Sequence, residues 1–182
     1  MTVLIGLDVA GSADQWVDAG FAVDPDGGCR VGHVRMQIGV GSKGIAGWTL
    51  AAGSSPVQPA THANRATQLD HVVVFAADPD QTIEEYAALD LAVRRVRELG
   101  NGTRQTFFRA GEVIIELVGP IPDVRGTRLW GLAFTVDDLD ACAAGYGEKI
   151  GRVKDAVQPG RRIATLRNGA FGLTIPIAFM SA

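Results

Sequence analysis

One order of segments occurs twice in the second half of the chain, and it constrains the fold more than any single motif. An apolar stretch from Asp70, DHVVVFAA, leads into the helical stretch DPDQTIEEYAAL, in which Asp78 and Asp80 suit the start of a helix. Three extended segments follow: LAVRRV, TRQTFFRA and EVIIELVGP. The same order returns from Leu129 with LWGLAFTV, DDLDACAAGYGEKI, GRVKDAV, RRIATLR and AFGLTIPIAF. The sequence therefore predicts two β-α-β-β-β modules, at 68–120 and 128–180, that form one domain over 68–182.

A weaker third copy is predicted at residues 1–53. There VLIGLDVAG reads as a strand, SADQWVDAGF as a short helix, and FAVDP, RVGHVRMQIG and GIAGWTLAAG as three extended segments. The stretch between the copies, SSPVQPATHANRAT at 54–67, has no periodicity and is typical of a linker. Aligning the acidic helix starts places Gly131 and Ile5 at the position that His71 holds in the middle copy.

Two turn signals predict how the later strands pair. Asn168-Gly169 favours a two-residue hairpin that sets Arg161 opposite Pro176 and Ile163 opposite Thr174. Ala110-Gly111 gives a second hairpin that sets Gln105 opposite Glu116. In both hairpins alternation yields one apolar face, which we expect to pack against the helix, and one mixed face. The apolar faces are Ala164, Leu166, Phe171, Leu173, Ile175 and Ile177 in one hairpin and Phe108, Val113, Ile115 and Leu117 in the other.

Composition indicates a soluble globular protein and excludes several classes. The net charge is -3 and no basic patch is interleaved with aromatics, so nucleic-acid binding is not expected. The arginine clusters at 94–97 and 160–162 are expected on solvated faces. Two distant cysteines, Cys29 and Cys142, together with the absence of a signal peptide or a spanning apolar run, favour the cytoplasm and no membrane contact.

The tandem of modules, with a histidine in LDHVVVFAADPDQT and a glutamate in GEVIIELVGP, resembles the vicinal oxygen chelate superfamily. That group includes glyoxalase I, extradiol dioxygenases, methylmalonyl-CoA epimerase and bleomycin-resistance proteins. The resemblance implies an α+β fold in which a curved, mainly antiparallel sheet of two modules forms a cup. It also implies one metal ligand from the first and one from the last strand of each module.

Carried over residue by residue, the metal positions are His71 and Glu116 in the middle copy. They become Gly131 with Pro176 or Thr174 in the last copy, and Ile5 with Thr49 in the first. Two donors are too few for firm binding of a divalent transition metal. Two interpretations follow: a partial metal site of His71 and Glu116, or a metal-free polar pocket in which Gln105, Arg109 or His71 holds Glu116. The second is favoured, so no cofactor is expected, although a divalent metal remains an alternative.

Several other residues allow both a binding and a structural interpretation. Arg161 suits an anionic group of a ligand, or lies in solvent at a strand end. The side chains Val73, Phe75, Phe107, Ile114 and Ile163 line a ligand pocket or fill a collapsed cup. Trp130 is expected in the core on the helix side, and His33 and His62 on the surface or in the linker.

These observations predict a glyoxalase-like protein that binds a small organic molecule in the cup, as resistance-type proteins do. The predicted ligand-binding residues are His71, Phe75, Gln105, Phe107, Arg109, Glu116, Arg161, Ile163 and Thr174. The alternative is a metal-dependent glyoxalase-type lyase, isomerase or dioxygenase that uses His71 and Glu116. Because an odd third module leaves an apolar face (Ile5, Met36, Ile38, Trp48), a homodimer is also predicted.

Overall fold

The computed structural model describes residues 1–53 and 58–182 and has an α+β fold built on two sheets. The first 53 residues form one sheet and its helix: β1 (Thr2–Val9), α1 (Ala13–Asp18), β2 (Gly28–Val31), β3 (Val34–Ile38) and β4 (Ile45–Ala52). The middle module comprises β5 (Ala66–Ala76), α2 (Pro79–Ala88), β6 (Val93–Gly100), β7 (Thr103–Ala110) and β8 (Val113–Gly119). The last comprises β9 (Thr127–Val136), α3 (Leu139–Tyr146), β10 (Lys154–Asp155), β11 (Arg162–Thr165) and β12 (Ile177–Met180), with short 3-10 turns at Gly147–Lys149 and Asn168–Phe171.

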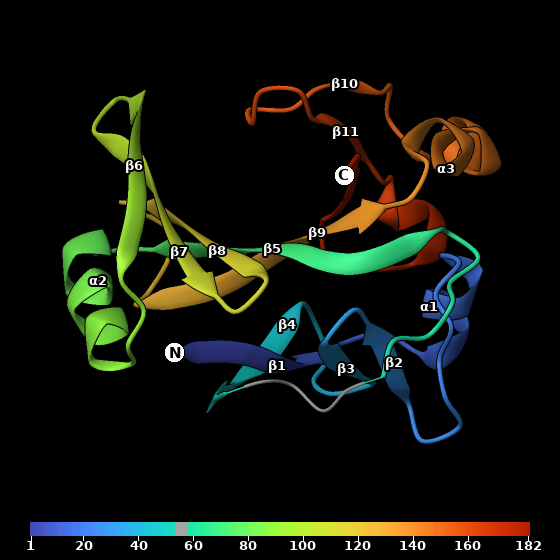
Figure 1. The fold of residues 1–182 in the computed structure, drawn as a ribbon, viewed down its shortest axis with the longest axis horizontal. Helices are drawn as coiled ribbons and strands as arrows, with labels where there is room; N and C mark the ends of the chain where they lie inside the picture. Colours follow the sequence, from blue (N-terminus) through green and yellow to red (C-terminus); the bar gives the residue numbers. More distant parts are fainter. Residues whose placement is uncertain (54–57) are drawn as a thin grey trace.

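The middle and last modules join edge to edge into one eight-stranded sheet of order β10-β11-β12-β9-β5-β8-β7-β6. Each module pairs its first and last strands in parallel, β5 with β8 and β9 with β12, and every other pairing is antiparallel. In Figure 1 the two ends of this sheet, β6 and β10–β11, rise on the same side of its centre. The predicted curved sheet of two β-α-β-β-β modules is therefore confirmed.

The first sheet covers the outer side of the long sheet, opposite the cup (Figure 1). Phe21, which follows α1, is almost fully buried, with ring centroids 5.0 Å from Phe134 and 6.3 Å from Phe179. At the other end Trp48 packs against Tyr86 of α2. Burial of these aromatic side chains stabilises the packing of the first 53 residues against the rest of the chain.

The order β2-β3-β1-β4 repeats the centre of the long sheet, β7-β8-β5-β9. β1 pairs in parallel with β3 as β5 does with β8, and in antiparallel with β4 as β5 does with β9. The prediction of strands at FAVDP and over the whole of RVGHVRMQIG is wrong. That second segment folds back at Gly32-His33, where Gly32 takes a φ of +58°.

This pairing also corrects the equivalent positions in the first copy. By strand register, the residue equivalent to His71 is Gly6 and not Ile5. The residue equivalent to Glu116 is Gln37 of β3 and not Thr49. Neither change restores a metal-binding set, since glycine offers no donor.

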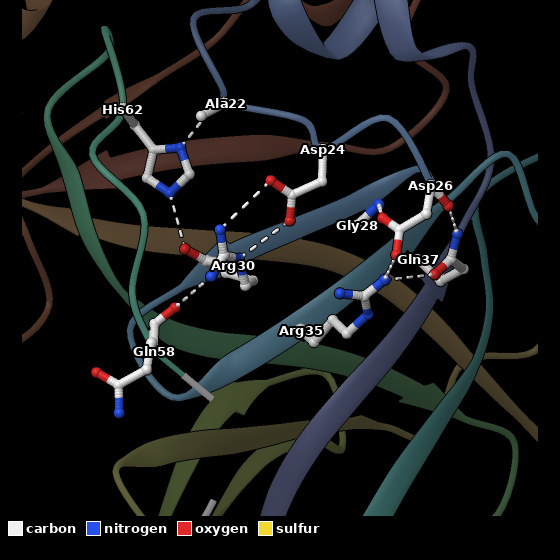
Figure 2. Close-up of polar contacts among 9 residues, drawn as sticks. All are labelled: Ala22, Asp24, Asp26, Gly28, Arg30, Arg35, Gln37, Gln58 and His62. Atoms are coloured by element: carbon white, nitrogen blue, oxygen red, sulfur yellow. Dashed lines mark hydrogen bonds and ion pairs between the residues drawn. The ribbon is translucent and has the colours of Figure 1, made fainter. Parts of the chain in front are cut away.

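A polar cluster ties the segment that precedes β5 onto the first sheet (Figure 2). His62 accepts a hydrogen bond from the Ala22 N–H at Nδ1 (2.9 Å), while its Nε2 lies 3.1 Å from the Arg30 carbonyl oxygen. Arg30 in turn pairs with Asp24 and donates to the Gln58 carbonyl oxygen. His62 is only 5% exposed, so the expected surface placement is wrong, although it does lie within the predicted linker 54–67. The first four linker residues, 54–57, lie outside the described residues.

Three further predictions concern elements away from the cup. Asp78 caps the N-terminus of α2, as the sequence predicted. Asp138 caps the N-terminus of α3 in the same way. Cys29 and Cys142 are both free and buried. Among the described residues, no helix is both long and apolar enough to cross a bilayer.

Candidate functional site

The concave face of the long sheet surrounds a cavity of about 520 Å³. Most of the side chains that border it are apolar, and they come from β5, β7, β8, β9, β11 and β12: Val73, Phe75, Phe107, Ile114, Val118, Trp130, Leu132, Ile163, Ile177 and Met180. The expected lining residues thus border an open cavity and do not fill a collapsed one. The polar and charged side chains that join them are His71, Arg94, Arg95, Gln105, Arg109, Glu116, Gln158 and Thr165.

Two β-bulges at the centre of the sheet set the chemistry of the cup. Leu69 pairs with Phe134 and His71 with Ala133, which leaves Asp70 as an extra residue in β5. Val73 pairs with Gly131 and Val74 with Leu129, which leaves Trp130 as the extra residue in β9. Since residues 60 apart correspond in the two modules, Asp70 and Trp130 occupy equivalent bulges. A bulge changes where the extra side chain points.

The bulge brings the Asp70 carboxylate against the ring of its neighbour His71. One carboxylate oxygen contacts His71 Nδ1, and the other lies 2.9 Å from an Arg161 nitrogen and accepts a hydrogen bond from the Thr135 hydroxyl at 2.9 Å. The Asp70 side chain is 12% exposed. Burial opposes its ionisation, but hydrogen bonds from His71 and Arg161 outweigh burial, so the pKa of the Asp70 carboxyl lies well below its usual range.

These contacts fix the orientation of the His71 ring. The Gln158 amide nitrogen lies 3.1 Å from His71 Nε2, and Nδ1 faces the Asp70 carboxylate. The two ring nitrogens of His71 are thus held by a buried carboxylate and by an amide that borders the cavity.

Glu116 lies on the same concave face, on the neighbouring strand β8. The Gln105 amide donates to its carboxylate, and the Gln105 oxygen accepts from Arg97 at 3.3 Å. The predicted contact between Gln105 and Glu116 is present, but the register of the hairpin is shifted. Phe107 pairs with Glu116 and Ala110 with Val113, so the turn is Gly111-Glu112 and not Ala110-Gly111. A shift of two residues leaves every side chain on its predicted face.

The second predicted hairpin is wrong. Asn168 begins a 3-10 turn that ends at Gly172 in the left-handed conformation, and β11 pairs with β12 so that Ile163 faces Met180. The reason is that β12 must reach β9, with which it pairs in parallel over residues 177–180. Thr174 consequently lies outside the cavity, where its hydroxyl accepts from the Gly44 N–H at 2.9 Å.

The register identifies which residues replace the two donors in the last module. His71 corresponds to Gly131, as the sequence indicated. Glu116, which pairs with Val73, corresponds to Ala178, which pairs with Ala133, and not to Pro176 or Thr174. Neither glycine nor alanine ligates a cation. In the described part of the chain, no three His, Cys, Asp or Glu side chains gather as a metal site would need, so the residues do not fit a divalent transition metal.

Of the nine predicted ligand-binding residues, seven border the cavity: His71, Phe75, Gln105, Phe107, Arg109, Glu116 and Ile163. Arg161 does not border it, because its guanidinium lies behind His71, where it binds Asp70 and the Ser181 carbonyl oxygen. Neither predicted interpretation of Arg161 is correct.

Sequence reasoning missed five residues of the site: Asp70, Trp130, Gln158 and the adjacent Arg94 and Arg95. Trp130 stacks on Phe75 with ring centroids 4.8 Å apart and borders the cavity, so the core placement was wrong. The acidic neighbour of the histidine in LDHVVVF was a visible signal for Asp70. Gln158, in the loop between β10 and β11, carries no sequence signal of its own.

Comparison with known proteins supports the fold. No protein-family model and no curated protein matches the chain. Among solved structures, methylmalonyl-CoA epimerase from Mycobacterium tuberculosis is 23% identical, with a TM-score of 0.52, over 64% of this chain and 89% of its own. A Streptomyces coelicolor methylmalonyl-CoA epimerase variant, in complex with 2-nitronate-propionyl-CoA, is 20% identical with a TM-score of 0.50, over 64% and 98%. A hypothetical protein from Bacillus halodurans is 18% identical with a TM-score of 0.50, over 63% and 94%.

These identities are informative about the fold alone, and the matched share is close in length to β5 through β12. Over 64% of the chain the fold is similar to that of methylmalonyl-CoA epimerase, so the predicted resemblance to the vicinal oxygen chelate superfamily is confirmed as a resemblance of fold.

Proposed function

We propose that this protein binds a small organic molecule in the cup without a full metal site, as a sequestering binding protein. The observation that supports this proposal is the open cavity of about 520 Å³, whose wall is mainly apolar. A concave, mostly apolar pocket with few polar groups is the usual form of a small-molecule site. His71, Gln105, Glu116 and Gln158 provide the polar groups that would orient the ligand.

The donor set supports the metal-free form of the proposal. His71 Nε2 is hydrogen-bonded to Gln158, and Nδ1 faces Asp70. Glu116 is held by Gln105, and the equivalent positions in the last module are Gly131 and Ala178. A site with two engaged donors binds a divalent transition metal weakly.

The neutral dye N-phenyl-1-naphthylamine, which fluoresces in apolar surroundings, tests the proposal. We expect saturable binding by the wild-type protein and loss of binding in Ala178→Phe, which places a ring inside the cup. Ala88→Phe, at an exposed position at the end of α2, is the matched control and should bind as the wild type does. Equal dye binding by all three proteins would show that the cup is not the binding site.

Metal analysis of protein purified without a chelator separates this proposal from a metal-dependent lyase, isomerase or dioxygenase. We expect a metal content far below one ion per chain, and no change in dye binding on addition of EDTA. Near-stoichiometric Zn, Ni, Mn or Fe that is lost in His71→Ala would contradict the metal-free proposal and favour the enzyme.

The Asp70–His71 pair favours a second candidate, metal-free acid–base catalysis. A carboxylate that holds one side of an imidazole supports the other nitrogen as a general base, once a substrate replaces Gln158 at that nitrogen. A carbon-acid probe such as 5-nitrobenzisoxazole tests this: transfer of its C–H proton to a base breaks the N–O bond and releases a coloured phenolate. A rate that is equal in the wild type and in His71→Gln would exclude this candidate.

A further inference from the structure

Three arginine side chains, Arg94, Arg95 and Arg109, border the cavity at the wall formed by β6 and β7. β6 is one of the two edge strands of the long sheet. Val93 pairs with Phe108 and Arg95 with Phe107, which makes Arg94 the extra residue of a further bulge. Because of this bulge, two consecutive arginines of β6 both border the cup. Arg109 follows from β7, on the same face as Phe107.

The three guanidinium groups have no carboxylate partner among the described residues, whereas neighbouring arginines of the same hairpin are engaged. Arg104 pairs with Asp80, and Arg97 donates to Gln105. Arg109 donates only to the carbonyl oxygen of Gly111. The arginines that border the cavity are thus the ones left available for an external acceptor.

The cavity is cationic in an acidic protein. Its border holds three arginines and one carboxylate, Glu116, so its formal charge is +2 with His71 neutral, while the chain carries -3. Gln105 already donates to the Glu116 carboxylate. A cleft of one charge sign with apolar walls concentrates ligands of the opposite sign.

The centre of the sheet, at β5 and β9, suits an aromatic or otherwise flat apolar group. Phe75 and Trp130 stack with an interplanar angle of 21° and both border the cavity. Together they present a broad aromatic surface, and Phe107 lies on the β7 side.

We infer, on the basis of the proposed function, that the ligand is an amphipathic organic anion. Its apolar body lies against Phe75, Trp130 and Phe107, and its carboxylate, sulfonate or phosphate lies at Arg94, Arg95 and Arg109. Guanidinium groups bind such oxyanions through paired hydrogen bonds. Under this inference, the anion-binding role that the sequence suggested for Arg161 passes to Arg94 and Arg95, together with Arg109, which was itself a predicted ligand-binding residue.

A pair of dyes with the same aromatic body tests this inference: 1-anilinonaphthalene-8-sulfonate and the neutral N-phenyl-1-naphthylamine. We expect the wild type to bind the sulfonate about tenfold more tightly than the neutral dye, a preference that shrinks as salt is raised. R94Q/R95Q/R109Q should lose the preference and keep its affinity for the neutral dye. R35Q/R65Q/R162Q removes three charges at ion pairs away from the cup and should keep the preference.

Other outcomes of the dye experiment distinguish failure of this inference from failure of the proposed function. Binding of the neutral dye with no preference for the sulfonate overturns the inference and leaves the proposed function intact. A preference that survives in R94Q/R95Q/R109Q overturns the inference as well. Failure of the wild type to bind either dye overturns the proposed function itself.

Discussion

The Asp70 carboxylate is buried among His71, Thr135 and Arg161, and it orients the ring that faces the cup. One extra residue in β5 creates this contact, and the equivalent extra residue in β9 is Trp130. The two halves of the cup therefore differ at corresponding positions. In one half the Asp70 carboxylate contacts the ring of His71, and in the other the Trp130 ring borders the cavity.

The adjacent arginines Arg161 and Arg162 provide a matched test of this network. Arg161→Met leaves the Asp70 carboxylate buried without its cation, and we expect a loss of about 3–5 kcal/mol in the free energy of unfolding. Arg162→Met removes an exposed pair with Asp140 and should leave the unfolding midpoint almost unchanged. Urea denaturation measures both. Similar midpoints for the two variants would show that Arg161 does not stabilise the network.

Sequence reasoning predicted His71 and the contact of Glu116 with Gln105, but not the Asp70 and Gln158 contacts of His71. Strand alternation assigned Trp130 to the core, because a period of two assumes that neither strand has an extra residue. A bulge changes the sheet face on which one side chain lies, and nothing in the sequence LWGLAFTV indicates the position of the extra residue. Residues that depend on bulges are thus the ones that the pattern could not place.

Among the elements, the hairpin β7–β8 was predicted more successfully than β11–β12. The shift of two residues in β7–β8 preserved both faces, since it is even. In the last module, Asn168-Gly169 is a strong local hairpin signal, but β12 also has to pair with β9. A turn signal read from two adjacent residues carries no information about the pairing of β12 with β9, a strand about forty residues earlier.

The segment before β5 depends on an uncharged His62. Burial lowers the pKa of His62, and its Nδ1 accepts from the Ala22 N–H, which a protonated ring cannot do. Because the folded pKa lies below the unfolded value, this contribution is complete above the ordinary histidine pKa of about 6.5 and is lost as the pH falls through the folded pKa.

A neutral mimic isolates this contribution. His62→Gln can both accept and donate, so its melting temperature should fall less between pH 8 and pH 5 than that of the wild type. His62→Ala leaves the partly buried Ala22 N–H without its partner, while the Arg30 carbonyl oxygen still accepts from the Ala60 N–H, and should cost about 1–3 kcal/mol at pH 8. Parallel pH profiles for the wild type and His62→Gln would rule out His62 as the titrating group.

In the whole molecule, the first sheet and the cup share one hydrophobic core. Met36 and Ile38, predicted as part of an exposed face that drives dimer formation, are buried within the chain's own core. The predicted reason for a homodimer is therefore wrong for these two residues, while the dimer itself stays a prediction.

A shared core predicts cooperative unfolding. Phe21→Ala removes the ring that contacts Phe134 and Phe179 across the two sheets, and should cost about 3–5 kcal/mol. Far-UV circular dichroism and tryptophan fluorescence should still report one coincident transition, at lower denaturant. Two separate transitions in the wild type would show that the sheets unfold independently.

The close approach at Gly131 limits how this protein can change. A Cβ atom there would lie 3.1 Å from the Pro176 carbonyl oxygen and 3.3 Å from the Pro176 Cβ. A histidine in the second half of the cup therefore requires the chain at Pro176, just before β12, to give by a few tenths of an ångström. A symmetric set of four ligands thus depends on how far this neighbouring segment yields, and not on the ligand positions alone.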